Sequence, residues 1–223
     1  MGTITALEPQ RRSGRVNVFV DGEFALGLHN SVAEDQGLRI GLEISAEDLQ
    51  AASKDEERRR AVANAVRMLE SRSRSKQEIE SRLLERAYST EVIEAVLGQL
   101  TRAGLVDDPA FAKEWVGARS RAKEPVGRIR LKYELKLKGI APELAEQALG
   151  DVDEADELAQ AIRAARRHTR PYAGYTGWMA EKQRLAGYLQ RRGYGWDITH
   201  AVLREVIGEC REEDSSNDFA SEA

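Results

Sequence analysis

Apolar and polar positions alternate over the first part of the chain and then change to a helical spacing. The stretch "VNVFVDGEFALGL" consists of two apolar-rich runs joined by Asp21-Gly22, a dipeptide that favours a tight hairpin turn because both residues tolerate positive φ. Together with "ITALEP", it predicts a small β segment over residues 3 to 28. In "ISAEDLQAA", Ser45 and Asp48 have the spacing of a capping box, which predicts the start of a short helix.

From about residue 55 to residue 208 the pattern is helical, and it repeats. Three segments align without a gap: "RLLERAYSTEVIEAVL" from Arg82, "ELKLKGIAPELAEQAL" from Glu134 and "YLQRRGYGWDITHAVL" from Tyr188. In the middle of each, a small residue precedes an apolar one, which is typical of a helix that ends in a left-handed turn before a second helix begins. Ala87 stands where the other two segments have glycine. A left-handed alanine is strained, so we expect this first turn to close differently.

A further helical run precedes each of these segments, with apolar residues at spacings of three or four. These residues are Val62, Val66 and Leu69 in the first run, Phe111 and Trp115 in the second, and Leu158, Ile162 and Ala165 in the third. Asp108 followed by Pro109 predicts the N-cap and first turn of the second run. The unit is therefore a module of three helices, present three times.

The predicted fold class is mainly α: three tandem three-helix repeats in an elongated or curved array, preceded by a small N-terminal β-hairpin segment. The expected boundaries are 1–53 for the β segment and short helix, 54–106, 107–151 and 152–208 for the three repeats, and 209–223 for an acidic disordered tail.

The stretch "GRIRLKYELKLKGIA", Gly127 to Ala141, alternates apolar and charged residues like an exposed strand. Its alignment with the two other segments favours a helix over residues 127 to 138 instead, because short alternation is a weak signal against a longer repeat. Leu131 and Leu135 then face the core and Ile140 closes it. The cations of this helix spread over more than one face.

Charge adds a functional hypothesis to this fold. The net charge is −4, but acidic residues gather after residue 208 and basic residues gather in the middle of the chain. A local basic field attracts phosphate or an acidic protein surface even on an acidic chain. The predicted binding patch is Arg119, Arg121, Lys123, Arg128, Arg130, Lys132, Lys136 and Lys138, and further phosphate contacts are expected from Arg72, Arg74, Arg191 and Arg192.

Signals for catalysis are absent from the sequence. One cysteine cannot form an intrachain disulfide, and the three histidines lie far apart without a metal-ligand spacing. The adjacent carboxylates Asp107 and Asp108 are interpreted as structural, with Asp108 as the helix N-cap, and there is no Gly-rich phosphate loop or nucleophile–base motif. We therefore predict a protein that is not an enzyme and that holds no metal or cofactor.

Two further features bear on location and on partners. No apolar run approaches the roughly 18 to 20 residues that a membrane helix needs, and the N-terminus lacks a signal-peptide core, so we expect a cytoplasmic protein. Tyr172, Tyr175 and Trp178 fall in "RPYAGYTGWM", which is interpreted as a loop of the third repeat. These aromatic residues are expected to pack beneath the loop or to stack on a partner.

The order of these motifs resembles the RecX regulatory proteins of bacteria. The most specific blocks are "LVDDPAFAKEWV" and "YLQRRGYGWDI", and the resemblance covers roughly residues 3 to 208. It implies tandem three-helix repeats and a non-enzymatic regulator of homologous recombination and DNA repair. Such a regulator binds the RecA recombinase filament in its helical groove and restrains ATP hydrolysis and strand exchange.

From this resemblance we expect a monomer whose partners are the RecA filament and single- or double-stranded DNA, contacted directly or through the filament. Two alternatives stay open. One is a stand-alone, sequence-indifferent DNA-binding protein, and the other is an adaptor that binds another protein through its acidic face.

Overall fold

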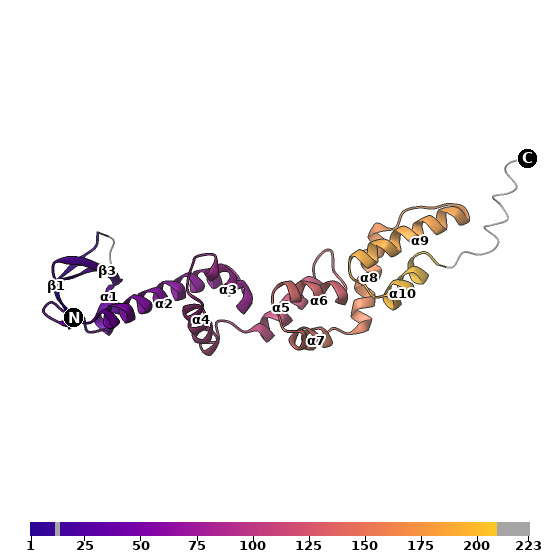
Figure 1. Ribbon diagram of the computed structural model, residues 1–223. Helices are drawn as coiled ribbons and strands as arrows, with labels where there is room; N and C mark the ends of the chain where they lie inside the picture. Colours follow the sequence, from indigo (N-terminus) through magenta and orange to yellow (C-terminus); the bar gives the residue numbers. More distant parts are fainter. Residues whose placement is uncertain (12–13, 209–223) are drawn as a thin grey trace, which may run out of the picture. The chain divides into compact units, whose positions relative to one another are not determined.

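The computed structural model describes residues 1–11 and 14–208, and it contains two compact units that meet in sequence between Val106 and Asp107 (Figure 1). The first unit holds a small sheet and the first three-helix repeat. The second holds the other two repeats. The acidic tail predicted for 209–223 lies outside the described residues, and the expected domain boundaries stay a prediction.

The first unit begins with an antiparallel sheet in the order β3-β2-β1-β4. Its strands are β1 (Gly2–Pro9), β2 (Arg15–Val20), β3 (Glu23–His29) and β4 (Glu43–Ile44). The predicted hairpin is confirmed: Asp21 and Gly22 join β2 to β3 at φ values of 53° and 88°. Ile4, Val18 and Leu28 are buried beneath the sheet, where the short helix α1 (Asn30–Asp35) also contributes to the core.

The helix predicted to start at Ser45 is confirmed at its start and wrong in its length. The Ser45 hydroxyl accepts from the Asp48 amide at 3.1 Å, and the Asp48 carboxylate accepts from the Ser45 amide at 2.9 Å. The helix, α2 (Ala46–Ser71), then continues without a break for 26 residues and becomes the first helix of the first repeat. It contains neither glycine nor proline, so nothing in its interior ends it.

A buried carboxylate connects α2 to the sheet. Glu56 is buried near the middle of the helix, where it accepts from the His29 amide at 2.8 Å and from the Arg15 guanidinium at 2.5 Å. A buried charge with such partners is expensive to remove, because its loss leaves the donors without acceptors. Glu56 therefore fixes the sheet on the helix.

The first repeat is completed by α3 (Lys76–Leu84) and α4 (Thr90–Arg102), which pack on the C-terminal half of α2. The turn between them contradicts the expectation drawn from Ala87. This alanine takes the left-handed conformation, at φ 60°, and the Ala87 and Tyr88 amides donate back to Leu84 and Leu83 at 2.9 and 3.3 Å. The Tyr88 hydroxyl accepts from the Asn64 side chain at 2.7 Å. The turn therefore closes like its glycine counterparts, and these contacts oppose the local strain.

The second repeat consists of α5 (Asp108–Ser120), α6 (Arg128–Leu137) and α7 (Pro142–Gly150). The helical interpretation of "GRIRLKYELKLKGIA" is confirmed, with Leu131, Leu135 and Ile140 buried in the core of the repeat. The N-cap of α5 is Asp107, which accepts from the Ala110 amide at 2.8 Å, and not Asp108 as predicted. A helix end read from sequence is commonly misplaced by one residue.

The third repeat consists of α8 (Glu154–His168), α9 (Gly174–Arg191) and α10 (Trp196–Val206). Tyr175 and Trp178 lie in the first turns of α9, so the loop predicted for them is wrong, whereas Tyr172 precedes the helix. Two glycines, Gly174 and Gly177, lie in the first turns of α9. Trp178 packs against the apolar core of the repeat, and such burial overrides the low helix propensity of glycine.

Candidate nucleic-acid interface

The second and third repeats are joined where α6 begins and α9 ends. The Gly127 amide donates to the Arg192 carbonyl oxygen at 2.9 Å, and the Ile129 amide donates to that of Gly193 at 3.1 Å. The amides at the start of a helix and the carbonyls at the end of one have no partner within their own helix. Each helix end here therefore satisfies the other, and we call this contact the repeat joint.

Two glycines allow this close approach. A Cβ atom on Gly127 would lie 2.4 Å from the Gly193 carbonyl oxygen, and one on Gly193 would lie 2.3 Å from the Arg130 amide nitrogen. Neither distance is possible for a real side chain. The sequence predicted a left-handed turn at Gly193, which is confirmed at φ 82°. It did not predict the close approach of Arg130, which also requires glycine there.

Side chains reinforce the repeat joint. The buried Glu157 of α8 accepts from the Arg128 amide at 3.0 Å. Arg192, whose side chain is 19% exposed, binds the Glu124 carboxylate and donates to the Glu124 carbonyl oxygen at 3.0 Å. This guanidinium lowers the pKa of the Glu124 carboxyl. Arg192, predicted as a phosphate contact, thus holds the segment between α5 and α6, while its neighbour Arg191 is exposed on α9.

Several predicted patch residues converge on one carboxylate, Glu134, whose side chain is 11% exposed. Arg119 donates to both of its oxygens at 2.9 and 2.8 Å, Arg130 donates at 3.2 Å, and the Trp115 indole donates at 3.1 Å. Burial alone would raise the pKa of Glu134, but the bonds and charge of Arg119, with those from Trp115 and Arg130, hold it below its usual value. Arg119 therefore stabilises the contact between α5 and α6, whereas Arg130 pairs with Glu134 within α6.

Other patch residues also have partners within the fold. Lys132 pairs with Glu146 of α7, and the Lys132 ammonium lowers the pKa of that carboxyl. Lys138 lies 4.0 Å above the ring of Trp115, and Arg128 donates to the Val152 carbonyl oxygen at 3.4 Å. Much of the charge predicted for this surface is thus neutralised or engaged locally.

Arg121, Lys123 and Lys136 are the exposed members of the patch that form no ion pair with another described residue. Two of them, Arg121 and Lys123, lie beside two arginines of α8, Arg163 and Arg167, around a cavity of about 330 Å³. The Arg167 guanidinium donates to the Lys123 carbonyl oxygen at 2.6 Å, which ties the segment after α5 to α8. We call these four residues and their cavity the four-cation cavity.

The chemistry of the four-cation cavity is that of an anion site. Its remaining lining residues are Ser120, Ala122, Pro125, Gln160 and Ala164, so no carboxylate of the described part of the chain lines it. Guanidinium groups bind phosphate oxygens through paired N–H donors, and an ammonium adds a point charge. Sequence reasoning missed Arg163 and Arg167. Their spacing of four on a helix was the available signal, because it places both on one face.

The predicted contacts Arg72 and Arg74 lie in the first unit, after α2. Arg72 pairs with Glu78 at 2.9 Å, and Arg74 donates to the Met68 carbonyl oxygen at 3.1 Å. Glu78 is also the capping residue of α3. Both arginines therefore stabilise the turn from α2 to α3, although Arg72 keeps an exposed side chain.

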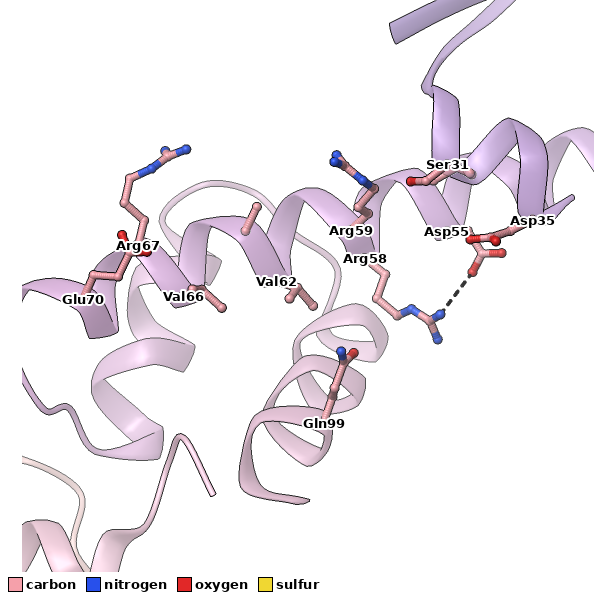
Figure 2. Close-up of a pocket in the computed structure, with 12 residues that line it drawn as sticks. Ser31, Asp35, Asp55, Arg58, Arg59, Val62, Val66, Arg67, Glu70 and Gln99 are labelled. Carbon is pink, nitrogen blue, oxygen red and sulfur yellow. Dashed lines mark ion pairs between the residues drawn. The ribbon is translucent and has the colours of Figure 1, made fainter. Parts of the chain in front are cut away.

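The first unit has its own cavity, of about 640 Å³, along α2 (Figure 2). Val62 and Val66 line it, and Figure 2 shows Arg58 turned toward Asp55, with which it pairs at 3.8 Å. The charged side chains around it are of both signs: Arg58, Arg59 and Arg67 against Asp35, Asp55 and Glu70. Such a balanced lining does not select an anion, so this cavity is a weaker candidate for nucleic-acid contact.

Residues 1–11 and 14–208 contain no group of three or more His, Cys, Asp or Glu side chains that could hold a metal ion. Over the same residues, no helix combines the length and apolar character that crossing a membrane requires.

The fold and the repeat joint define a class: a tandem three-helix-repeat protein with a small N-terminal sheet and a basic cavity between repeats. Four profiles of one protein family match the chain in order: the regulatory protein RecX N-terminal domain over residues 2–45, and the first, second and third RecX three-helix domains over 61–100, 107–149 and 154–203. The chain belongs to the RecX family.

Curated relatives and solved structures agree with this assignment. Proteins named regulatory protein RecX are 35% identical in Amycolatopsis mediterranei, over 69% of this chain and 86% of that one, and 34% identical in Chlorobium limicola, over 69% and 93%. A crystal structure of regulatory protein RecX covers 91% of this chain and 98% of its own, at 22% identity and a TM-score of 0.71. A structure of RecX from Lactobacillus salivarius gives 0.60 at 19% identity, over 68% and 97%. These two likenesses support the fold.

Proposed function

We propose that this protein regulates the RecA recombinase filament on DNA, that it restrains ATP hydrolysis and strand exchange, and that it catalyses no reaction itself. The four-cation cavity is the observation that carries the proposal, because it offers phosphate-binding groups within the repeat array of a family named for regulation. The proposal extends to a monomeric protein of the cytoplasm that acts in homologous recombination and DNA repair.

The proposed action combines two contacts. The cations of the four-cation cavity bind the phosphate backbone, which carries no sequence information and therefore suits a partner that must act anywhere along a filament. The surfaces of the repeats contact RecA subunits next to that DNA. A protein that occupies both positions opposes the movement of strands and of subunits that accompanies exchange.

Co-sedimentation with RecA filaments, with DNA-only controls, tests the proposal together with the rate of RecA ATP hydrolysis. The informative variant is the triple reversal Arg121→Glu, Lys123→Glu and Arg163→Glu. These residues form no ion pair with another described residue, so the reversal removes none of the ion pairs described above. We expect binding to the filament and inhibition of ATP hydrolysis to weaken about tenfold or more, with a shallower dependence on salt.

A matched control carries the same change of charge elsewhere. Arg39→Glu, Arg60→Glu and Arg102→Glu change exposed arginines of the first unit, so this triple variant should inhibit close to the wild-type level. Equal inhibition by both triple variants would contradict the placement of the contact. Reversal of Arg128, Arg130 and Lys132 is a poorer test, because these side chains have partners within the fold.

The alternative is a stand-alone DNA-binding protein, and the same cavity supports it, since phosphate chemistry does not require RecA. The two functions are distinguished by comparing the affinity for RecA-coated DNA with the affinity for bare DNA. A regulator of the filament should bind RecA-coated DNA more tightly than bare DNA at the same salt concentration. Equal affinities, with a steep salt dependence for both, would favour the alternative.

A further inference from the structure

The third repeat contains a second groove, lined by aromatic and cationic side chains of α9 and α10. Its volume is about 410 Å³, and Leu203 is the single aliphatic side chain among the described residues that line it. Tyr175, Trp178 and Lys182 line it from α9 at spacings of three and four, which places them on one helix face. The remaining lining residues, from α10 and its end, are His200, Leu203, Arg204 and Gly208.

The rings in and beside this groove form two pairs. Tyr175 and Trp178 have ring centroids 5.8 Å apart at 26°. Next to the groove, Trp196 packs on His200 with centroids 4.4 Å apart. Tyr175 is 49% exposed and Trp196 is 59% exposed, so each pair includes a ring that faces solvent. Large exposed aromatic side chains that lie close together mark a binding surface more often than an ordinary one.

Polar groups in the groove are available to a ligand. Arg204 is exposed on α10, and Lys182 lies 4.5 Å above the Trp178 ring; neither forms an ion pair with another described residue. The nearby carboxylate Glu205 pairs with Arg166, so it does not neutralise Arg204.

We propose that this groove binds single-stranded nucleic acid, with bases stacked on the exposed rings of Tyr175 and Trp196 and phosphates held by Lys182 and Arg204. Aromatic platforms next to cations are the recurring solution for single strands, because every base has a face that stacks and every linkage carries a charge. The inference does not depend on the proposed regulation of RecA, since it concerns a contact of this chain alone.

Other occupants use less of what the groove offers. A duplex presents phosphates to the two cations but keeps its bases stacked inside, so the exposed rings of Tyr175 and Trp196 gain nothing. An acidic peptide would form ion pairs with Lys182 and Arg204 but would not stack on the exposed rings. An apolar helix needs an aliphatic floor, and the groove has one leucine.

The test compares labelled oligothymidine with an abasic oligomer of the same length, both titrated with the full chain in the absence of RecA and followed by fluorescence anisotropy. The abasic oligomer carries the phosphates without the bases. We expect the base-bearing oligomer to bind about fivefold more tightly or better for each stacked ring. Tyr175→Ala with Trp196→Ala should remove this preference and leave the abasic affinity unchanged.

Matched variants separate stacking from loss of fold. Tyr133→Ala removes an equally exposed tyrosine, at 50%, from α6 and should leave the preference intact. Trp196→Phe keeps a ring and should retain most of it. Equal affinity for the two oligomers, or a preference that survives removal of both rings, would overturn the proposal. Duplex DNA that competes with labelled oligothymidine as well as single-stranded DNA does would also overturn it. The same holds if the double variant loses as much affinity for poly-glutamate as it loses for oligothymidine.

Discussion

The amide of Gly127 donates to the carbonyl oxygen of Arg192 over 2.9 Å, and this bond joins the start of one helix to the end of another sixty-five positions later. Local sequence signals describe each helix end separately, with a small residue before α6 and a left-handed glycine after α9. The long-range contact makes them a single feature. It also sets the positions of the chain segments that carry the four-cation cavity.

Substitution at this contact should therefore affect stability and binding together. We expect Gly127→Ala to lower the free energy of unfolding by about 1–3 kcal/mol, because the added methyl group would overlap the Gly193 carbonyl oxygen and force the helix ends apart. Urea denaturation measures the change, and filament binding should fall with it. Gly150→Ala is the control: its methyl group meets nothing within 4 Å, so no loss is expected. Equal losses in both variants would contradict the close contact.

Replacing the left-handed alanine of the first repeat, Ala87, with glycine should stabilise the protein. Ala87→Gly should raise the free energy of unfolding by about 0.5–1 kcal/mol, because the relief of the left-handed penalty exceeds the extra flexibility of glycine in the unfolded chain. Thermal and urea unfolding of the full chain measure this gain. Ala103→Gly, at an ordinary φ of −79°, should instead destabilise by a similar amount. A loss in both variants would show that Ala87 is not strained.

Glu134 predicts a specific dependence of stability on pH. Its pKa is lower in the folded chain than the unfolded value of about 4.3, so the carboxylate stabilises the fold above that pH, and the contribution is lost as the pH falls through the folded pKa. Glu134→Gln should cost about 1–3 kcal/mol at neutral pH and flatten the loss of stability below about pH 4.3. Urea midpoints between pH 7 and pH 3 measure both effects. A parallel pH profile for the variant would contradict this role.

Removing the Tyr194 hydroxyl should not destabilise the protein. This hydroxyl is buried in the third repeat without a hydrogen-bond partner among the described residues, and burial raises its pKa. Tyr194→Phe should leave the free energy of unfolding unchanged or raise it by about 1 kcal/mol, since an unsatisfied buried group is lost. Tyr172→Phe is the contrast: its hydroxyl donates to the Ile207 carbonyl oxygen at 2.8 Å, so a loss of about 1 kcal/mol is expected. Equal losses would contradict the assignment.

The repeat pattern predicted most of the fold because equivalent positions in the three repeats, about fifty residues apart, have the same environment in the folded chain. An assignment made in one repeat therefore applies to the other two. It placed Leu131 and Leu135 in the core against a local pattern that favoured a strand, and the structure confirms this. It did not predict the length of α2. The helix start at Ser45 and the apolar run with Val62, Val66 and Leu69 look like two separate motifs in the sequence, but one unbroken helix contains both. Ala87 was wrongly expected to alter its turn, since tertiary contacts of Tyr88 outweigh a local preference.

The candidate site was less predictable than the fold. Counting cations along the chain identified a basic region but not which charges are available to a ligand. Glu134 is one acidic residue in a basic stretch, yet it engages both Arg119 and Arg130. Conversely, Arg163 and Arg167 were overlooked because they lie in α8, outside the basic stretch that the count of cations identified, although α8 has basic residues of its own. Availability depends on packing across repeats, which no local window contains.

The continuity of α2 has a mechanical consequence for the first unit. Its 26 residues span on the order of 39 Å at 1.5 Å per residue. Figure 1 shows the sheet beside the N-terminal part of α2 and the helices α3 and α4 beside its C-terminal part, and Glu56 in the N-terminal half bonds the helix to the sheet. A helix of this kind acts as a stiff lever. A pull or twist applied to the sheet reaches the first repeat undamped, so a partner that grips either end moves both.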